Sequence, residues 1–405
     1  MKRTYILSAI SLLISGMVSA NPLGTNEGSA DTSASEANSK TVVGGYGNAF
    51  YSYDSNEERA KINLERFVLF FGHKFNSQFS LFSELEVEDA KVAGGEEGGE
   101  VALEQCYIQY NVNNNNYFKF GLFLPKIGIL NTNHLPTEYL DNERTIIETQ
   151  LIPSTWRELG VSFNGSLYSV PFNYSVALVN GLNCESFEHG NVIRDGRYEG
   201  SNASGNNLAI TGAVDYSIAG FKFQASGYYG GSVGLAKKEA DLIGIEGGIF
   251  GTPVSLGEFD ITYRYKRFEF KALAAVVSIK DAETINKVYD NNTPESAFGV
   301  YAEAAYALHE SENLNKPQRL MLFGRFEKLN LNAGIPDNGI EDKTLDQQHI
   351  IFGLSYQPIQ NVIFKADAHL SSTGEQNPLL LDDPSAAALY KKTNTFINLG
   401  FGYSF

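Results

Sequence analysis

Apolar and polar residues alternate along most of the chain, the period-two pattern of a β-strand with one apolar face. The last nine residues, INLGFGYSF (397–405), show it clearly, because large apolar residues alternate with small or polar ones. The alternation and the intervening turn signals predict sixteen strands. Their expected ranges are 43–52, 62–74, 77–88, 101–112, 116–124, 155–164, 171–181, 207–217, 221–230, 256–265, 268–279, 297–309, 317–329, 347–357, 361–371 and 393–405. The register of 101–112 stays open, because its pattern is ambiguous.

The connections between these strands form a second pattern. After even-numbered strands they are short, as at 75–76 and 266–267, whereas after odd-numbered strands they are long, as at 53–61, 125–154 and 182–206. An even strand number with short periplasmic turns and long outer loops is typical of transmembrane β-barrels. Lipid leaves no backbone group unpaired, so such a sheet must close. A soluble sandwich or propeller is the alternative, but it would not enforce unequal connections.

We therefore predict an all-β fold: a transmembrane antiparallel β-barrel of about 16 strands over residues 42–405, with its last strand pairing with its first. Residues 1–20 have a basic start, an apolar run and small residues at Val18-Ser19-Ala20, as in a cleaved signal peptide. Residues 21–41 are rich in Ser, Ala, Gly and Asn and predict a flexible lead-in. We expect the mature chain in the outer membrane of a Gram-negative bacterium, in contact with its lipid.

The formal net charge of -16 argues against nucleic acid or an anionic membrane surface as a partner. The two cysteines cannot form a disulfide framework. Cys106 falls in an expected strand and Cys184 in an expected loop. We expect two separate thiols, although an oxidising compartment would permit one bond.

A sixteen-stranded barrel is wide enough for an aqueous channel. Charged side chains on the polar faces of the strands would then screen solutes by size and charge, or form only a solvated wall. The main candidates are Arg66, Glu84, Glu86, Lys119, Arg264, Lys271, Arg325, Lys365 and Asp367; further ones are Glu88, Lys222, Asp260, Glu303 and Glu327.

The longest internal connection, 125–154, contains many apolar residues, so we expect it to pack inside the lumen as the third outer loop and narrow the pore. Residues 137–148 are expected to form a short helix capped by Thr137. The residues expected near the constriction are Lys126, His134, Glu138, Tyr139, Asp141, Glu143, Arg144 and Glu148.

Residues 118–165 resemble the loop region of bacterial outer-membrane porins of the phosphate-selective porin O/P-like family. The matching pieces are the strand end Gly121-Leu122-Phe123, Ile127-Gly128-Ile129, Asn133-His134, Glu143-Arg144 and residues 152–158, IPSTWRE. The resemblance implies a sixteen-stranded homotrimer with this loop inside. The rows of Arg and Lys that carry anion selectivity in that family have no counterpart here, and the acidic loop favours a general or mildly cation-preferring pore.

The terminal Phe405 resembles the carboxyl-terminal aromatic residue that outer-membrane proteins present to their assembly machinery. We expect it to act as an assembly signal and to lie in the periplasmic aromatic girdle.

The six histidines are scattered, and none is spaced with another His or a Cys as metal ligands are. The acidic stretches 94–100 and 290–292 lack the ordered spacing of a calcium site. We expect no metal, no cofactor and no enzymatic activity. The predicted function is passive diffusion of small hydrophilic solutes and ions; the alternatives are a phosphate- or anion-selective porin, a plugged structural or adhesive barrel, and an outer-membrane hydrolase.

Overall fold

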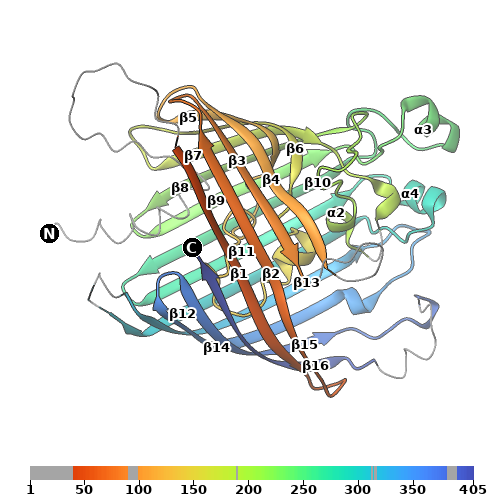
Figure 1. The fold of residues 1–405 in the computed structure, drawn as a ribbon. Helices are drawn as coiled ribbons and strands as arrows, with labels where there is room; N and C mark the ends of the chain where they lie inside the picture. Colours follow the sequence, from red (N-terminus) through yellow and green to blue (C-terminus); the bar gives the residue numbers. More distant parts are fainter. Residues whose placement is uncertain (1–39, 90–98, 188–189, 312, 314–316, 381–389) are drawn as a thin grey trace.

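The computed structural model describes residues 40–89, 99–187, 190–311, 313, 317–380 and 390–405. These residues form a closed barrel in which sixteen antiparallel strands follow one another in sequence order and β16 pairs with β1 (Figure 1). The predicted fold class and closure are therefore confirmed. The expected signal peptide and the lead-in up to residue 39 lie outside the described residues.

The observed strands match the sixteen expected ones to within a few residues at each end. They are β1 (Lys40–Asp54), β2 (Arg59–Lys74), β3 (Phe79–Glu88), β4 (Glu100–Asn111), β5 (Asn116–Phe123), β6 (Glu158–Ser166), β7 (Phe172–Asn180), β8 (Leu208–Ile218), β9 (Phe221–Gly230), β10 (Val254–Tyr265), β11 (Phe268–Ile279), β12 (Ser296–Glu310), β13 (Arg319–Gly334), β14 (Asp346–Ile359), β15 (Val362–Thr373) and β16 (Thr393–Ser404). The first strand begins at Lys40, so the last two residues of the expected lead-in belong to the barrel.

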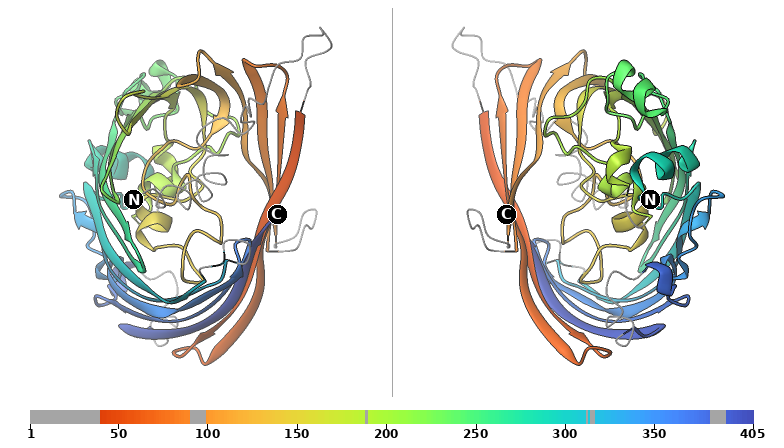
Figure 2. Two further views of the ribbon diagram at one scale, coloured as in Figure 1. Left: turned by 90° about the vertical axis from the view of Figure 1, so that its left-hand side faces the viewer. Right: turned by 90° about the vertical axis from the view of Figure 1, so that its right-hand side faces the viewer.

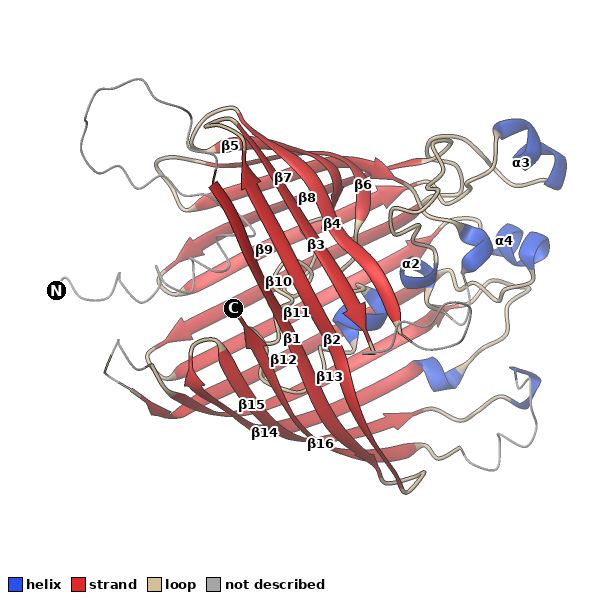
Figure 3. Cartoon of the chain, viewed as in Figure 1, coloured by secondary structure: helices blue, strands red, loops and turns tan. Residues whose placement is uncertain are grey.

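Most of the short helical segments lie at the end of the barrel that carries the long loops, whereas most of the connections at the other end are short (Figure 3). The helical segments are η1 (Ile147–Leu151), η2 (Cys184–Ser186), α2 (Val192–Asp195), α3 (Lys237–Ile243), α4 (Ala282–Tyr289), η3 (Lys343–Leu345) and η4 (Pro378–Leu380). Among the described residues, no helix has the length and apolarity needed to cross a membrane. Cys106 and Cys184 are both free thiols, as expected.

One expected long loop is instead a tight turn. The connection predicted over 53–61 is reduced to residues 55–58, because β1 and β2 keep pairing as far as Asp54 and Arg59. Asp54 Oδ1 accepts hydrogen bonds from the backbone N–H groups of Asn56 (2.8 Å) and Glu57 (3.1 Å). Side-chain acceptance of this kind stabilises a turn and leaves the strands free to extend.

The faces of the strands are arranged in the opposite way to those of a soluble protein. Outward-facing Leu399 and Phe352 are 52% and 51% exposed, whereas inward-facing Asp260 and Asp367 are 2% and 7% exposed. An exposed apolar surface that encircles a barrel is what a lipid-embedded sheet requires. The alternation read from the sequence therefore assigns the two faces correctly.

Of the register shifts between the described strands, two β-bulges each add a glutamate to the lumen. In β2 the pairing passes from Asn48–Arg66 to Ala49–Leu64, which leaves Glu65 without a partner residue. In β4 it passes from Glu84–Gln105 to Leu85–Leu103, which leaves Glu104 extra. A bulge lets two adjacent residues face the same side. The bulge at Glu104 explains why the register of this strand could not be read from its pattern.

The carboxyl terminus completes the seam between the first and last strands. Gly45 N–H donates to Phe405 O (3.0 Å), and Phe405 N–H donates to Gly45 O (2.8 Å). The Phe405 ring is 60% exposed and lies 6.5 Å from the Tyr403 ring, centroid to centroid. This aromatic residue is therefore presented at the turn end of the barrel.

Removing Phe405 is expected to lower the amount of folded barrel in the membrane severalfold, because both the closing hydrogen bonds and the exposed ring are lost. Phe405→Ala, which keeps the backbone bonds, separates the two contributions, and Phe405→Tyr is the matched control. Heat-modifiable migration on a gel measures the folded fraction. Unchanged folded protein after deletion would contradict both roles.

Candidate pore constriction

The chain between β5 and β6, residues 124–157, folds into the barrel, as predicted. In the views along the barrel axis this segment lies inside the ring of strands, on the side of β9–β13 (Figure 2). The loop and the neighbouring connection 181–207 share one apolar core with the inner wall. Buried residues of that core are Ile127, Ile147, Leu151 and Trp156 from the first loop, Leu182, Val192 and Ile193 from the second, and Leu256, Leu273, Val277 and Leu329 from the wall.

The prediction of a short helix over 137–148 is wrong. The helical turn in this loop is η1, and residues 137–146 form turns and bends. Backbone groups that a helix would use internally are bonded to the wall instead. Asn142 N–H donates to Asp367 Oδ2 (2.9 Å), and Leu140 O accepts from the Ser355 hydroxyl (2.6 Å). Tertiary contacts thus override the local helix signal.

Glu148 holds the loop in its folded shape. Its Oε1 accepts the backbone N–H groups of Ile129 and Leu130, both at 2.6 Å, and its Oε2 accepts the Tyr301 hydroxyl of β12 at 2.8 Å. The side chain is buried. Burial raises the pKa of Glu148, while these donors act in the opposite direction. Glu148 therefore stabilises the folded loop rather than lining a pore opening.

The tip of the loop is fixed to the wall of β13–β16. Asp141 pairs with Arg325, which also contacts Glu327 (2.8 Å) and Glu303 (3.2 Å). The Lys365 ammonium lies 3.6 Å from the centre of the Tyr139 ring. On β16, a Cβ placed on Gly400 would lie 2.2 Å from Asn142 Oδ1. Only glycine lets the loop approach this strand so closely.

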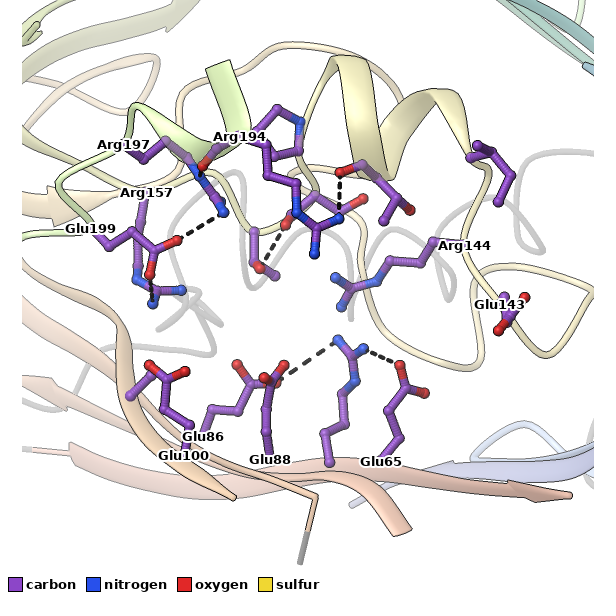
Figure 4. Close-up of a pocket in the computed structure, with 17 residues that line it drawn as sticks. Glu65, Glu86, Glu88, Glu100, Glu143, Arg144, Arg157, Arg194, Arg197 and Glu199 are labelled. Carbon is purple, nitrogen blue, oxygen red and sulfur yellow. Dashed lines mark hydrogen bonds and ion pairs between the residues drawn. The ribbon is translucent and has the colours of Figure 1, made fainter. Parts of the chain in front are cut away.

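An outer pocket of about 430 Å³ lies between the loops and the wall of β2–β4. Carboxylates stand on the wall and guanidinium groups stand opposite, on the two loops (Figure 4). The wall carries Glu65, Glu86, Glu88 and Glu100 together with Arg66; the loops carry Arg144, Arg157, Arg194 and Arg197 with Glu143 and Glu199. Opposed rows of charge produce a transverse field across the pocket.

Several of these charges are already paired. Arg66 contacts Glu65 (2.7 Å) and Glu86 (3.8 Å), and Glu199 accepts from both Arg157 (2.6 Å) and Arg197 (2.8 Å). The pocket holds six carboxylates and five guanidinium groups. Its lining is therefore close to electrically balanced, and its polarity comes from the separation of the two signs.

A larger inner pocket of about 1070 Å³ lies toward the turn end. Its charged lining is mostly basic, and Asp215 is the one carboxylate among the described lining residues. The basic residues are Lys74, Lys119, Lys126, Lys222 and Arg264. Lys126 forms an ion pair with Asp215. Asparagine and serine side chains supply much of the remaining surface.

The two pockets have no lining residue in common. Between them His134, on the loop, meets Tyr46 of β1 and the bulge residue Glu104 of β4. His134 Nε2 lies 2.8 Å from the Tyr46 hydroxyl and 3.8 Å from Glu104 Oε2, and Tyr46 donates to the same Glu104 oxygen at 2.8 Å. Burial lowers the pKa of His134 to about 4, against the influence of Glu104, so the ring is neutral at pH 7. We call this contact between loop and wall the partition.

The structure distributes the residues predicted for the constriction and lumen among different places. In the outer pocket lie Arg66, Glu86, Glu143 and Arg144, and in the inner pocket Lys119, Lys126 and Arg264. Side chains that fix the inward loop to the wall or stabilise its fold are Tyr139, Asp141, Glu148, Lys271, Arg325, Lys365 and Asp367. Glu84 and His134 belong to the partition, and Glu138 has an exposed side chain while its backbone oxygen accepts from Lys271 (3.3 Å).

The sequence analysis did not identify six charged residues of the outer pocket. They are Glu65, Glu100, Arg157, Arg194, Arg197 and Glu199. Glu65 enters through a bulge, and three of the others come from the connection 181–207, which also folds inward. The apolar residues of that connection were the available signal, since the same criterion identified the loop at 125–154.

The chain therefore forms a closed sixteen-stranded barrel with a loop folded inside and charged side chains in the lumen. No family model matches the chain. An uncharacterized protein of Aquifex aeolicus (strain VF5) is 28% identical over 337 residues, which cover 80% of this chain and 74% of that protein.

Solved structures share the fold at low sequence identity. The outer membrane channel DcaP of Acinetobacter baumannii is 14% identical, with a TM-score of 0.54 over 92% of this chain and 99% of that one. Salmonella typhi OmpF, in a complex with daunomycin, is 14% identical, with a TM-score of 0.52 over 90% and 97%. An anion-selective porin from Comamonas acidovorans is 10% identical, with a TM-score of 0.53 over 91% and 100%. At these identities the likeness establishes the fold.

Proposed function

We propose that the protein is an outer-membrane porin through which small hydrophilic solutes and ions diffuse passively. The observation that carries the proposal is the outer pocket, where carboxylates of β2–β4 face guanidinium groups of two inward-folded loops. A water-filled passage with opposed charges excludes apolar and oversized solutes and orients dipolar ones. The apolar outer belt supports a place in the lipid of an outer membrane.

An anion-preferring porin is the second candidate, and the inner pocket favours it. Five basic side chains face a single carboxylate there, although the whole chain is acidic. Local charge in a narrow passage acts on an ion more strongly than distant surface charge, because salt screens beyond about 10 Å. The name of the Comamonas acidovorans porin, and the resemblance of residues 118–165 to phosphate-selective porins, point the same way.

Planar-bilayer recording of the purified barrel tests the proposal. Stepwise openings are expected, and the reversal potential in a KCl gradient distinguishes a general or cation-preferring pore from an anion-preferring one. Inorganic phosphate should reduce the chloride current only if the second candidate holds. A correctly folded barrel without conductance would favour the plugged structural alternative, and turnover of a lipid or peptide substrate would favour the hydrolase alternative.

We propose further that the protein assembles as a homotrimer, on the strength of the resemblance over residues 118–165. Native mass spectrometry in detergent tests this assembly. A mass of one chain under conditions that preserve heat-resistant folding would contradict it.

A further inference from the structure

We infer that Glu84, Glu104 and His134 form a binding site for one divalent transition-metal ion in the partition between the two pockets. One ligand atom from each of the three side chains lies within 4.8 Å of the other two. The residues come from β3, β4 and the inward loop, and each is at most 2% exposed. The inference does not depend on whether the barrel conducts.

The histidine is held in the orientation that a ligand needs. His134 Nδ1 donates to the backbone oxygen of Asn131 (3.0 Å), so the Nε2 lone pair is left to face the Tyr46 hydroxyl (2.8 Å) and Glu104 Oε2 (3.8 Å). Metal-bound histidines characteristically donate their other ring N–H to a carbonyl or a carboxylate, which fixes the tautomer. Gln105 similarly fixes the Glu84 carboxylate by donating to its Oε2 (2.6 Å).

The hydrogen bonds of the partition are too few for its acceptors. The Tyr46 hydroxyl has one hydrogen, yet both Glu104 Oε2 and the neutral His134 ring lie 2.8 Å from its oxygen. Glu104 Oε1 is buried and has no hydrogen-bond donor among the described residues. A buried acceptor without a donor costs about 1–3 kcal/mol. The cluster therefore contains buried acceptor atoms without donors, and a bound cation would satisfy them.

Acidic side chains predominate inside the cluster, where two carboxylates meet one imidazole and Glu86 stands next to Glu104. The nearest cations lie around the cluster. Arg66 contacts Glu86 at 3.8 Å, Lys119 interacts electrostatically with Glu84, and Arg144 does so with Glu104. The competing occupant is a proton shared between Glu86 and Glu104, because adjacent carboxylates cannot both ionise without compensation.

The donor set indicates which ions fit. One imidazole nitrogen with carboxylate oxygens suits Zn²⁺ or Mn²⁺, whereas Ca²⁺ and Mg²⁺ prefer oxygen ligands alone. Tetrahedral bonds of about 2.1 Å place ligand atoms about 3.4 Å apart, so modest side-chain rotations suffice to close the site on an ion. A bound ion would fasten the loop to the wall between the pockets.

Zinc content of the full-length barrel, refolded in detergent with Zn²⁺ and freed of excess ion, tests the inference. The expected result is one tightly held zinc ion per chain, reduced to background in His134→Gln and in Glu104→Gln. His309→Gln is the matched control, because this histidine is exposed at the end of β12. Excess Ca²⁺ or Mg²⁺ should not displace the zinc, because both prefer sites built of oxygen ligands alone.

X-ray absorption at the zinc edge of the wild-type protein tests the same site without any variant. One imidazole with oxygen donors is expected, and a shell with two imidazoles or with sulfur would overturn the assignment. A wild-type barrel that holds no zinc would overturn it as well, and would leave the shared proton as the occupant. Loss of zinc in His309→Gln, or its retention in His134→Gln, would place the ion elsewhere.

Discussion

Replacing Glu148 with alanine is expected to release the inward loop and to raise the single-channel conductance. The substitution removes the acceptor of hydrogen bonds from Ile129 N–H, Leu130 N–H and the Tyr301 hydroxyl. It also removes the acceptor of a longer bond from the Thr145 hydroxyl (3.4 Å). Each buried donor left without a partner costs about 1–3 kcal/mol, so the folded loop loses at least about 3 kcal/mol. That is enough to populate open arrangements of the loop and to increase current noise.

Two measurements report this release. Bilayer recordings give the conductance, and fluorescence gives the environment of Trp156, which is the single tryptophan of the chain and is fully buried beside the loop core. Its emission should shift to longer wavelength in Glu148→Ala. Glu138→Ala is the matched control, because Glu138 lies on the same loop with an exposed side chain. Wild-type conductance together with unshifted emission would refute the bracing role of Glu148.

Reversing one charge of the outer pocket, by Arg144→Glu, is expected to shift selectivity toward cations. The change alters the local charge by two units. At about 6 Å in water this amounts to about 1.4 kcal/mol before screening, or about a tenfold change in ion occupancy. Salt reduces the effect, so a severalfold rise in the cation-to-anion permeability ratio is expected at low salt and a smaller one at high salt.

The opposite wall provides the reciprocal test. Glu88→Lys changes the charge on the carboxylate side of the same pocket, so it should shift the reversal potential in the opposite direction. Arg59→Glu, at the exposed β1–β2 turn and outside the pocket, should have little effect. If Arg144→Glu and Arg59→Glu shift the potential equally, the pocket does not set selectivity.

The charge pattern inside the lumen depends on details that strand alternation does not contain. A period of two assigns alternate residues to alternate faces, but the bulges at Glu65 and Glu104 each place two neighbours on the inner face. Both bulge residues lie in the candidate site, Glu65 in the outer pocket and Glu104 in the partition.

The number of strands, their faces and the closure of β16 on β1 could be predicted from the amino-acid pattern, because periodicity and turn residues act over a few neighbouring positions. The apolar content of the loop also predicted that it folds inward. The opposition of charges in the outer pocket and the convergence of Glu84, Glu104 and His134 became visible only in the folded barrel. Those outcomes depend on bulges, loop paths and contacts between residues far apart in the chain, for which a local pattern carries no information.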